Sequence, residues 1–155
     1  MSNLPKQIFI GSDHAGFNHK QFIVNHIKQN YPDIKLVDLG PETADRCDYP
    51  DYAAKVSNKV VEEEKNGALG ILICGSGIGI SISANKIKGV RCGLCHNAYT
   101  AEMTRRHNNA NILALGERVV DLSLVPEIVD TFIKTEFEGK HHADRVQKIH
   151  ALESN

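Results

Sequence analysis

Residues 69–79 read Leu-Gly-Ile-Leu-Ile-Cys-Gly-Ser-Gly-Ile-Gly, an apolar run that ends in a cysteine and a glycine-rich turn. An uninterrupted apolar run of this kind is typical of a strand buried on both faces of a parallel sheet. The glycines after Cys74 favour a tight turn into a helix. We therefore place a strand at residues 69–74 and expect a binding site beyond its carboxyl end, where ligands bind in open α/β sheets.

Four further short apolar runs are expected to be strands, at residues 7–11, 34–38, 92–95 and 112–116. Between the strands, apolar side chains recur four residues apart, the spacing of one helix face. These pairs are Ile23 with Ile27, Val56 with Val60, and Tyr99 with Met103. Strands that alternate with helices predict βαβ units with right-handed crossovers. The expected fold is α/β: a Rossmann-like, doubly wound, five-stranded parallel sheet in an α/β/α sandwich.

The helical pattern near the carboxyl terminus is interrupted. A helix is expected from Pro126 to Phe137, and Gly139 separates it from a last helix that carries Val146, Ile149 and Leu152. No strand follows this extra C-terminal helix, and such amphipathic terminal helices commonly pack on a neighbouring subunit. We therefore expect a homo-oligomer.

Size and composition exclude several classes of protein. The 155 residues fit one domain, residues 1–155, that needs no disulfide bonds to be stable. A net charge of -1 gives no general attraction for nucleic acid or anionic lipid. No stretch approaches the roughly 18 apolar residues of a membrane span, and no signal peptide is evident. We expect a cytoplasmic protein whose four cysteines are reduced thiols.

The loop after Cys74 combines three physical effects. Glycines allow a close backbone approach to a ligand, consecutive N–H groups bind anions, and a helix amino terminus favours negative charge, including a thiolate. The alternative is a tight turn whose cysteine is only a small buried apolar residue. A dinucleotide site is disfavoured, because the spacing is G-x-G-x-G and follows the third strand.

Other motifs carry less weight. Residues 92–96, Cys-Gly-Leu-Cys-His, match the haem-attachment pattern, but we expect two small residues packed in a buried strand, and no second ligand pair for zinc is visible. Asp13 and His14 follow the first strand, where they could bind hydroxyls and phosphate or simply cap a helix. Residues 105–109 and 140–145 could be solvated charge or an anion site.

Taken together, these segments closely resemble the ribose-5-phosphate isomerase B family, which also contains allose- and galactose-6-phosphate isomerases. The resemblance covers nearly the whole chain. It rests on residues 11–16, 48–50, 74–81, 84–86, 106–108, 111, 115–118 and 145–146.

The resemblance implies a homodimer whose active sites use residues of both subunits, a small sugar-phosphate substrate, and no metal or nucleotide cofactor. By position, Cys74 is the base that moves a proton between C1 and C2, and His107 opens the sugar ring. Ser76 and the backbone of Gly75, Gly77, Ile78 and Gly79 hold the oxyanion. Substrate is bound by Asp13, His14, Tyr49, Asn108, Arg118 and Arg145.

One position departs from the family pattern. His141 stands where many relatives have an arginine, four residues before Arg145. The expected reaction interconverts ribose 5-phosphate and ribulose 5-phosphate through an enediolate, a step of the non-oxidative pentose phosphate pathway. An isomerase of allose or galactose 6-phosphate is the nearest alternative, and a non-catalytic sugar-phosphate sensor is a third.

Overall fold

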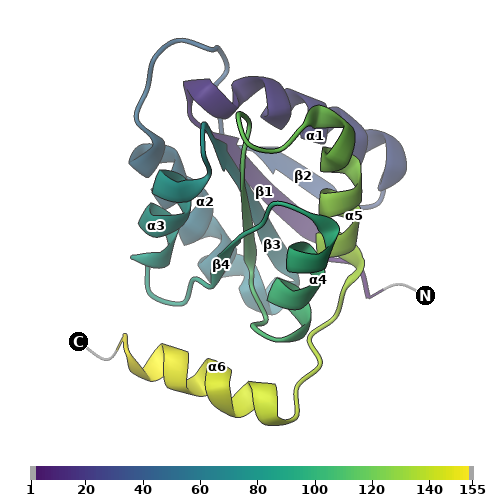
Figure 1. Cartoon of the computed structure of the whole chain (residues 1–155), viewed down its shortest axis with the longest axis vertical. Coiled ribbons are helices and arrows are strands. Elements are labelled where there is room, and N and C mark those ends of the chain that lie inside the picture. The colour runs from purple at the N-terminus through teal and green to yellow at the C-terminus, as the bar shows by residue number, and fades with distance from the viewer. Residues whose placement is uncertain (1–2, 154–155) are drawn as a thin grey trace.

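The computed structural model describes residues 3–153. Within them, five strands form one parallel sheet in the order β2-β1-β3-β5-β4 (Figure 1). The strands are β1 (Gln7–Ser12), β2 (Lys35–Asp38), β3 (Ala68–Cys74), β4 (Cys92–Leu94) and β5 (Ile112–Gly116). All seven residues of β3 are buried, because β1 pairs with one edge of it and β5 with the other. The predicted strands and parallel sheet are confirmed.

Helices cover both faces of this sheet (Figure 1). Their bounds are α1 (Phe17–Asn30), α2 (Tyr49–Glu63), α3 (Ile78–Asn85), α4 (Ala98–Arg106), α5 (Val125–Lys134) and α6 (His141–Ala151). α1, α4 and α5 bury apolar side chains in one core, and α2 and α3 bury theirs in another. The sandwich is therefore the predicted Rossmann-like one. None of the helices within residues 3–153 has the length and apolar content needed to cross a membrane.

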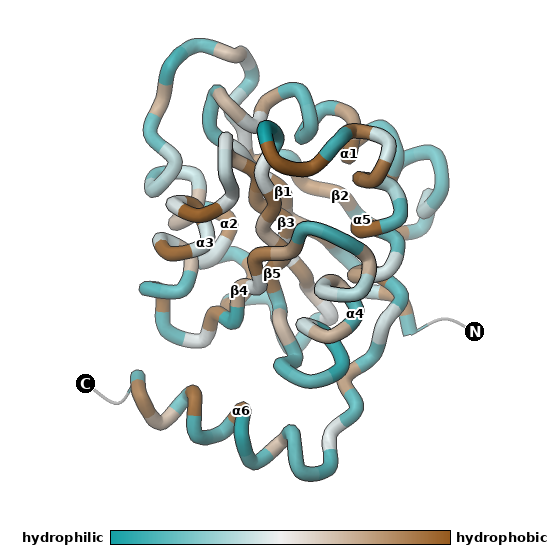
Figure 2. Tube along the Cα trace, viewed as in Figure 1, coloured by the Kyte–Doolittle hydropathy of each residue, from teal (hydrophilic) through white to brown (hydrophobic). Residues whose placement is uncertain are grey.

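Strand alternation divides the apolar side chains between the two cores. In β1, Ile8 and Ile10 enter the core under α1 and α5, while Phe9 enters the core under α2. In β3, Leu72 and Cys74 share the α2 and α3 side. Figure 2 shows hydrophobic residues concentrated along the strands, whereas α6 is mostly hydrophilic.

Three local predictions were wrong. α4 forms, but it buries Ala101 and Thr104, and Tyr99 on the predicted apolar face is 68% exposed. β4 is half-buried instead of buried on both faces, because it is an edge strand. α5 ends at Lys134, before the expected Phe137, since Thr135 adopts an extended conformation.

α6 stands apart from the sheet at one end of the molecule (Figure 1). Its Val146 is buried, but Ile149 is 42% exposed and Leu152 is 86% exposed. The separate C-terminal helix is confirmed. Apolar side chains on this helix are left in contact with solvent in a single chain, so its packing on another subunit stays a prediction.

The topology places the switch point of the sheet between β1 and β3. From β1 the chain goes to β2 on one side, and from β3 it goes to β4 and β5 on the other. The loops after β1 and β3 therefore diverge and leave a crevice at the carboxyl ends of the strands. Asp13 follows β1 and donates its N–H to the Ile73 carbonyl at 3.2 Å, which holds the two strand ends together.

Candidate active site

Cys74 is the last residue of β3, and its thiol is only 4% exposed. The Sγ atom accepts a hydrogen bond from the Gly77 N–H at 3.1 Å, at the amino terminus of α3. Gly77 has φ 79°, and a Cβ there would lie 2.6 Å from a Leu94 methyl carbon. Glycine is thus required for the turn that points an amide at the sulfur, at the positive end of the α3 dipole.

The loop after β5 completes the wall beside Cys74. Glu117 donates its N–H to the Cys74 carbonyl at 2.9 Å, and Arg118 donates to the Gly75 carbonyl at 3.0 Å. A Cβ on Gly75 would lie 3.0 Å from Arg118 Nη1, so the guanidinium rests against the glycine. Arg118 makes no side-chain hydrogen bond or ion pair with any other described residue. Its charge is available to an anionic ligand.

The loop after β1 supplies Asp13 and His14. Asp13 is 5% exposed, and its Oδ1 accepts the Gly16 N–H at 3.0 Å, which confirms the helix-cap alternative. That bond leaves Oδ2 for a ligand. His14 Nδ1 lies 3.1 Å from the Cys47 carbonyl oxygen and 3.3 Å from the Cys47 amide nitrogen. The Cys47 backbone therefore fixes the orientation of the His14 ring.

Tyr49 closes the crevice from the start of α2. A Cβ on Gly79 would lie 2.5 Å from Tyr49 Cζ and 2.9 Å from its hydroxyl oxygen, so the tyrosine ring packs directly on that glycine. Ser76 Oγ accepts the Ile78 N–H at 3.1 Å and is placed at the mouth of the loop. Gly75 and Gly79 thus make room for Arg118 and Tyr49, which could contact substrate.

These side chains line one hollow of about 690 Å³. Most of the predicted site residues lie along it, and Gly77 lies in its loop: Asp13, His14, Tyr49, Cys74, Gly75, Ser76, Ile78, Gly79 and Arg118. Six further residues line the hollow and were not among the predicted site residues: Ala15, Arg46, Cys47, Asp48, Ile82 and Val119. Arg46 and Cys47 lie in an irregular loop, and their only signal was proximity to the motif at residues 48–50. Burial chiefly raises the pKa of the Cys47 thiol, which disfavours it as the base.

Four predicted residues, His107, Asn108, His141 and Arg145, lie elsewhere. α4 runs antiparallel to the strands, so His107 at its end lies near the amino edge of the sheet. Asn108 lines a different hollow, with Cys92 and Ile149. His141 and Arg145 are exposed on α6, at the end of the molecule away from the loops after β1 and β3 (Figure 1).

His107, His141 and His142 form a histidine cluster. The rings of His107 and His142 stack with centroids 4.1 Å apart, and those of His141 and His142 lie 4.0 Å apart. Burial, followed by the charges of His141 and His107, lowers the pKa of His142. The ring of His142 is therefore neutral near pH 7, which allows close stacking.

Ligand atoms of His107, Glu138 and His142 lie within 4.8 Å of one another, as in some metal sites. However, the two rings are within 12° of parallel, so their lone pairs, which lie in the ring planes, do not converge on one point. Glu138 Oε2 is already bound by Arg106 Nε and Nη2, at 3.2 and 2.8 Å. Arg106 lowers the pKa of Glu138 and holds it as a carboxylate. Glu138 and His142 are better described as residues that support His107 than as ligands of a metal ion.

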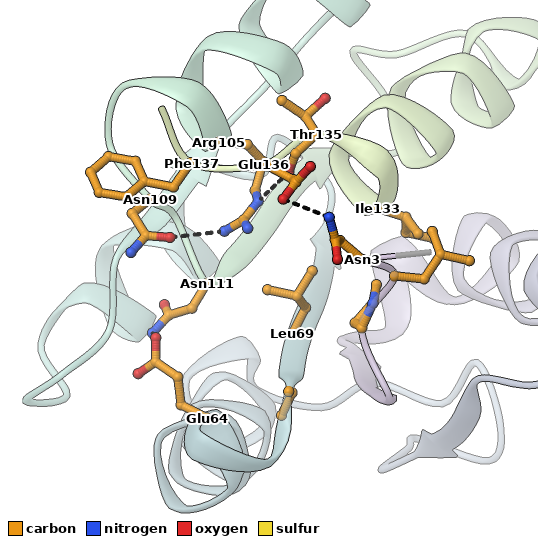
Figure 3. Close-up of a pocket in the computed structure, with 14 residues that line it drawn as sticks. Asn3, Glu64, Leu69, Arg105, Asn109, Asn111, Ile133, Thr135, Glu136 and Phe137 are labelled. Carbon is orange, nitrogen blue, oxygen red and sulfur yellow. Dashed lines mark hydrogen bonds between the residues drawn. The ribbon is translucent and has the colours of Figure 1, made fainter. Parts of the chain in front are cut away.

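Cys92, Cys95 and a hollow at the amino edge of the sheet offer no alternative active site. Burial raises the pKa of Cys92 and Cys95, the latter to about 11, so both are poor nucleophiles. A hollow of about 410 Å³ lies at the amino edge of the sheet (Figure 3). Its Arg105 is occupied by the Thr135 carbonyl at 3.1 Å and Asn109 Oδ1 at 3.3 Å. The residues that line it include no cysteine or histidine.

Comparisons with known proteins agree with this geometry. A family model described as Ribose/Galactose Isomerase matches residues 8–149. Ribose-5-phosphate isomerase B of Escherichia coli is 44% identical over 148 residues, which cover 96% of this chain and 97% of that protein. The structure of ribose-5-phosphate isomerase B from Clostridium thermocellum has a TM-score of 0.90 and 49% identity, covering 96% of this chain and 97% of that one. That of Mycoplasma genitalium with bound ribulose-5-phosphate has a TM-score of 0.89 and 43% identity, with coverage of 96% and 97%.

Proposed function

The chain belongs to the ribose/galactose isomerase family and is an isomerase, and we propose that it interconverts D-ribose 5-phosphate and D-ribulose 5-phosphate. One observation carries the proposal: a buried thiol accepts an amide hydrogen bond at a helix amino terminus, in a hollow that also holds Asp13, Ser76 and the free guanidinium of Arg118. Ribulose-5-phosphate bound to the Mycoplasma genitalium relative supports this choice of substrate.

The proposed chemistry is a proton transfer. The Cys74 thiolate removes the proton from C2 of the open-chain aldose, which leaves an enediolate across C1 and C2. The thiol then returns a proton to C1, while the hydroxyl proton passes from O2 to O1, so no atom or electron is gained. Amide groups of the glycine-rich loop and Ser76 would stabilise the oxyanion, the kind of fixed dipole that accelerates such steps most.

Arg118, Arg46 and His14 line the hollow and are the candidates on this chain for binding the phosphate. Asp13 and Tyr49 are placed to bind hydroxyls. No part of this scheme uses a metal ion or a nucleotide.

We further propose that two copies of the chain share each site. His107, Asn108, His141 and Arg145 are not among the residues that line the hollow of Cys74, yet His141 and Arg145 are exposed. Ile149 and Leu152 are exposed on the same helix, which gives α6 an apolar surface for a neighbouring subunit. In a homodimer, His107 of the partner subunit would open the sugar ring over Cys74.

We also propose that this enzyme is located in the cytoplasm.

The substrate is tested by incubating the purified protein with ribose 5-phosphate, allose 6-phosphate and galactose 6-phosphate in parallel. The proposal expects the highest kcat/KM with the pentose. Turnover of a hexose phosphate alone would keep the mechanism but refute the substrate. Binding of sugar phosphates with no turnover of any would favour the non-catalytic sensor.

His141 contributes to phosphate binding in this scheme, from the position where many relatives have an arginine. An arginine can bind phosphate through two parallel N–H bonds, which an imidazole cannot make. We therefore predict that His141→Arg lowers KM for ribose 5-phosphate by at least about threefold at a fixed pH. An unchanged KM would contradict this role.

Gly79→Ala tests the contact with Tyr49. The new Cβ would lie 2.5 Å from the tyrosine ring and would force the ring out of the hollow. We predict a fall in kcat/KM of at least about tenfold, because small displacements of substrate-positioning groups have large effects on rate. Ser83→Ala, on the same helix but outside the hollow, is the control. Equal kinetics for the two variants would show that Tyr49 does not contact substrate.

A further inference from the structure

His19 and Glu117 form a buried pair behind the site. His19 lies near the start of α1 and is 8% exposed, and the Glu117 side chain is 20% exposed. Glu117 Oε1 accepts the His19 N–H at 2.8 Å and lies 3.6 Å from His19 Nδ1. At the other side of the ring, His19 Nε2 donates to the Val120 carbonyl at 2.8 Å.

Both bonds hold the loop that carries Arg118. The Glu117 carboxylate accepts the His19 N–H, and the His19 imidazole donates to the Val120 carbonyl. The two hydrogen bonds therefore hold the loop on either side of Arg118. A carboxylate that accepts an N–H in the first turn of a helix is also favoured by the helix dipole.

The described residues of the loop make few other hydrogen bonds to the rest of the domain. The N–H groups of Val119 and Val120 bond back to Gly116 within the loop itself. Val119 is 54% exposed, whereas Val120 is buried in the core. The backbone bonds from Glu117 to Cys74 and from Arg118 to Gly75 are the remaining polar links. Without His19 and Glu117, the segment beside Arg118 would keep its hydrogen bonds to the catalytic loop but lose its hydrogen bonds to α1.

We propose that His19 and Glu117 are positioning residues that hold Arg118 against Gly75, so that its guanidinium faces the substrate phosphate. This inference rests on the proposed function, because it takes phosphate as the ligand of Arg118. Neither residue touches the hollow, so each acts through the loop.

The pair is tested with variants that separate the hydrogen bond from the charge. Glu117→Ala removes the acceptor for the His19 N–H, while Glu117→Gln keeps an acceptor of the same shape without the charge. We expect Glu117→Ala to raise KM for ribose 5-phosphate by about tenfold with kcat within about twofold. Glu117→Gln should restore most of the binding.

His26→Gln is the matched control. His26 lies on the same helix, about 10 Å further along it, and its Nε2 pairs with Asp130 Oδ1 at 2.8 Å. This variant loses a histidine–carboxylate contact away from the loop and should leave KM unchanged. An unaltered KM in Glu117→Ala, an equal rise in His26→Gln, or a loss of kcat alone would overturn the inference.

Calorimetric binding of inorganic phosphate separates this inference from the proposed function. If the wild type fails to isomerise ribose 5-phosphate but binds phosphate about tenfold more tightly than Glu117→Ala, the positioning role stands and the proposed reaction fails. If the wild type turns over the sugar and both proteins bind phosphate equally, the reaction stands and the positioning role fails. If the wild type binds no phosphate, the positioning role also fails.

Discussion

Cys74→Ala is expected to lower kcat for ribose 5-phosphate by about 10³-fold while leaving substrate affinity within a few-fold of the wild type. The reason is that the Cys74 sulfur accepts the Gly77 amide at the amino terminus of α3, within the loop assigned to the oxyanion. The change removes the sulfur but none of the groups assigned to the phosphate or the hydroxyls. Steady-state kinetics and calorimetric binding of ribose 5-phosphate measure the two effects separately.

Cys95→Ala is the control for loss of a buried thiol. Cys95 is 1% exposed and lies beyond β4, outside the site. It should lose some stability because it leaves a small cavity, but its kcat should match the wild type. If the kcat of Cys74→Ala is close to that of Cys95→Ala, the base is a residue other than Cys74.

Heterodimers that carry Cys74→Ala in one chain and His107→Ala in the other are expected to recover about half of the wild-type activity. Each single variant alone should be nearly inactive, since each lacks one member of every site. In the mixed dimer, one of the two sites combines the intact cysteine with the intact histidine. Co-expression of two differently tagged chains and sequential affinity purification isolates this species.

The matched control pairs a wild-type chain with a chain that carries both substitutions. If each site draws on two subunits, every site in this dimer lacks one residue and the dimer is nearly inactive. If each site lies within one chain, the control retains about half of the activity and the first heterodimer has none. Failure of the two tags to co-purify would refute the homodimer itself.

The sheet could be predicted from the sequence because its signals are local. The apolar run at residues 69–74 and the glycine turn after it each report on neighbouring residues, and burial on both faces of β3 follows from the same run. The sequence Lys65-Asn66-Gly67 likewise indicates a helix end with a left-handed glycine, and Gly67 has φ 77°.

The site could be predicted only in part. Asp13 follows β1 and Cys74 ends β3, and these strands pair in the sheet, so the parallel topology brings the two residues together. His107 lies at the end of a helix that runs back to the opposite edge, so the topology of one chain does not bring it to Cys74. Likewise, the apolar spacing of Tyr99 and Met103 gave the correct helix but the wrong buried face, because periodicity does not distinguish a core from an exposed apolar surface.

The most direct test of the account follows ribose 5-phosphate by proton NMR after addition of the purified wild-type protein, with a metal chelator present throughout. The account predicts that ribulose 5-phosphate accumulates until the two sugars reach equilibrium, at a rate that the chelator does not change. Absence of the ketose, or its formation only when the chelator is omitted, would contradict a cysteine-based isomerase that works without a metal ion.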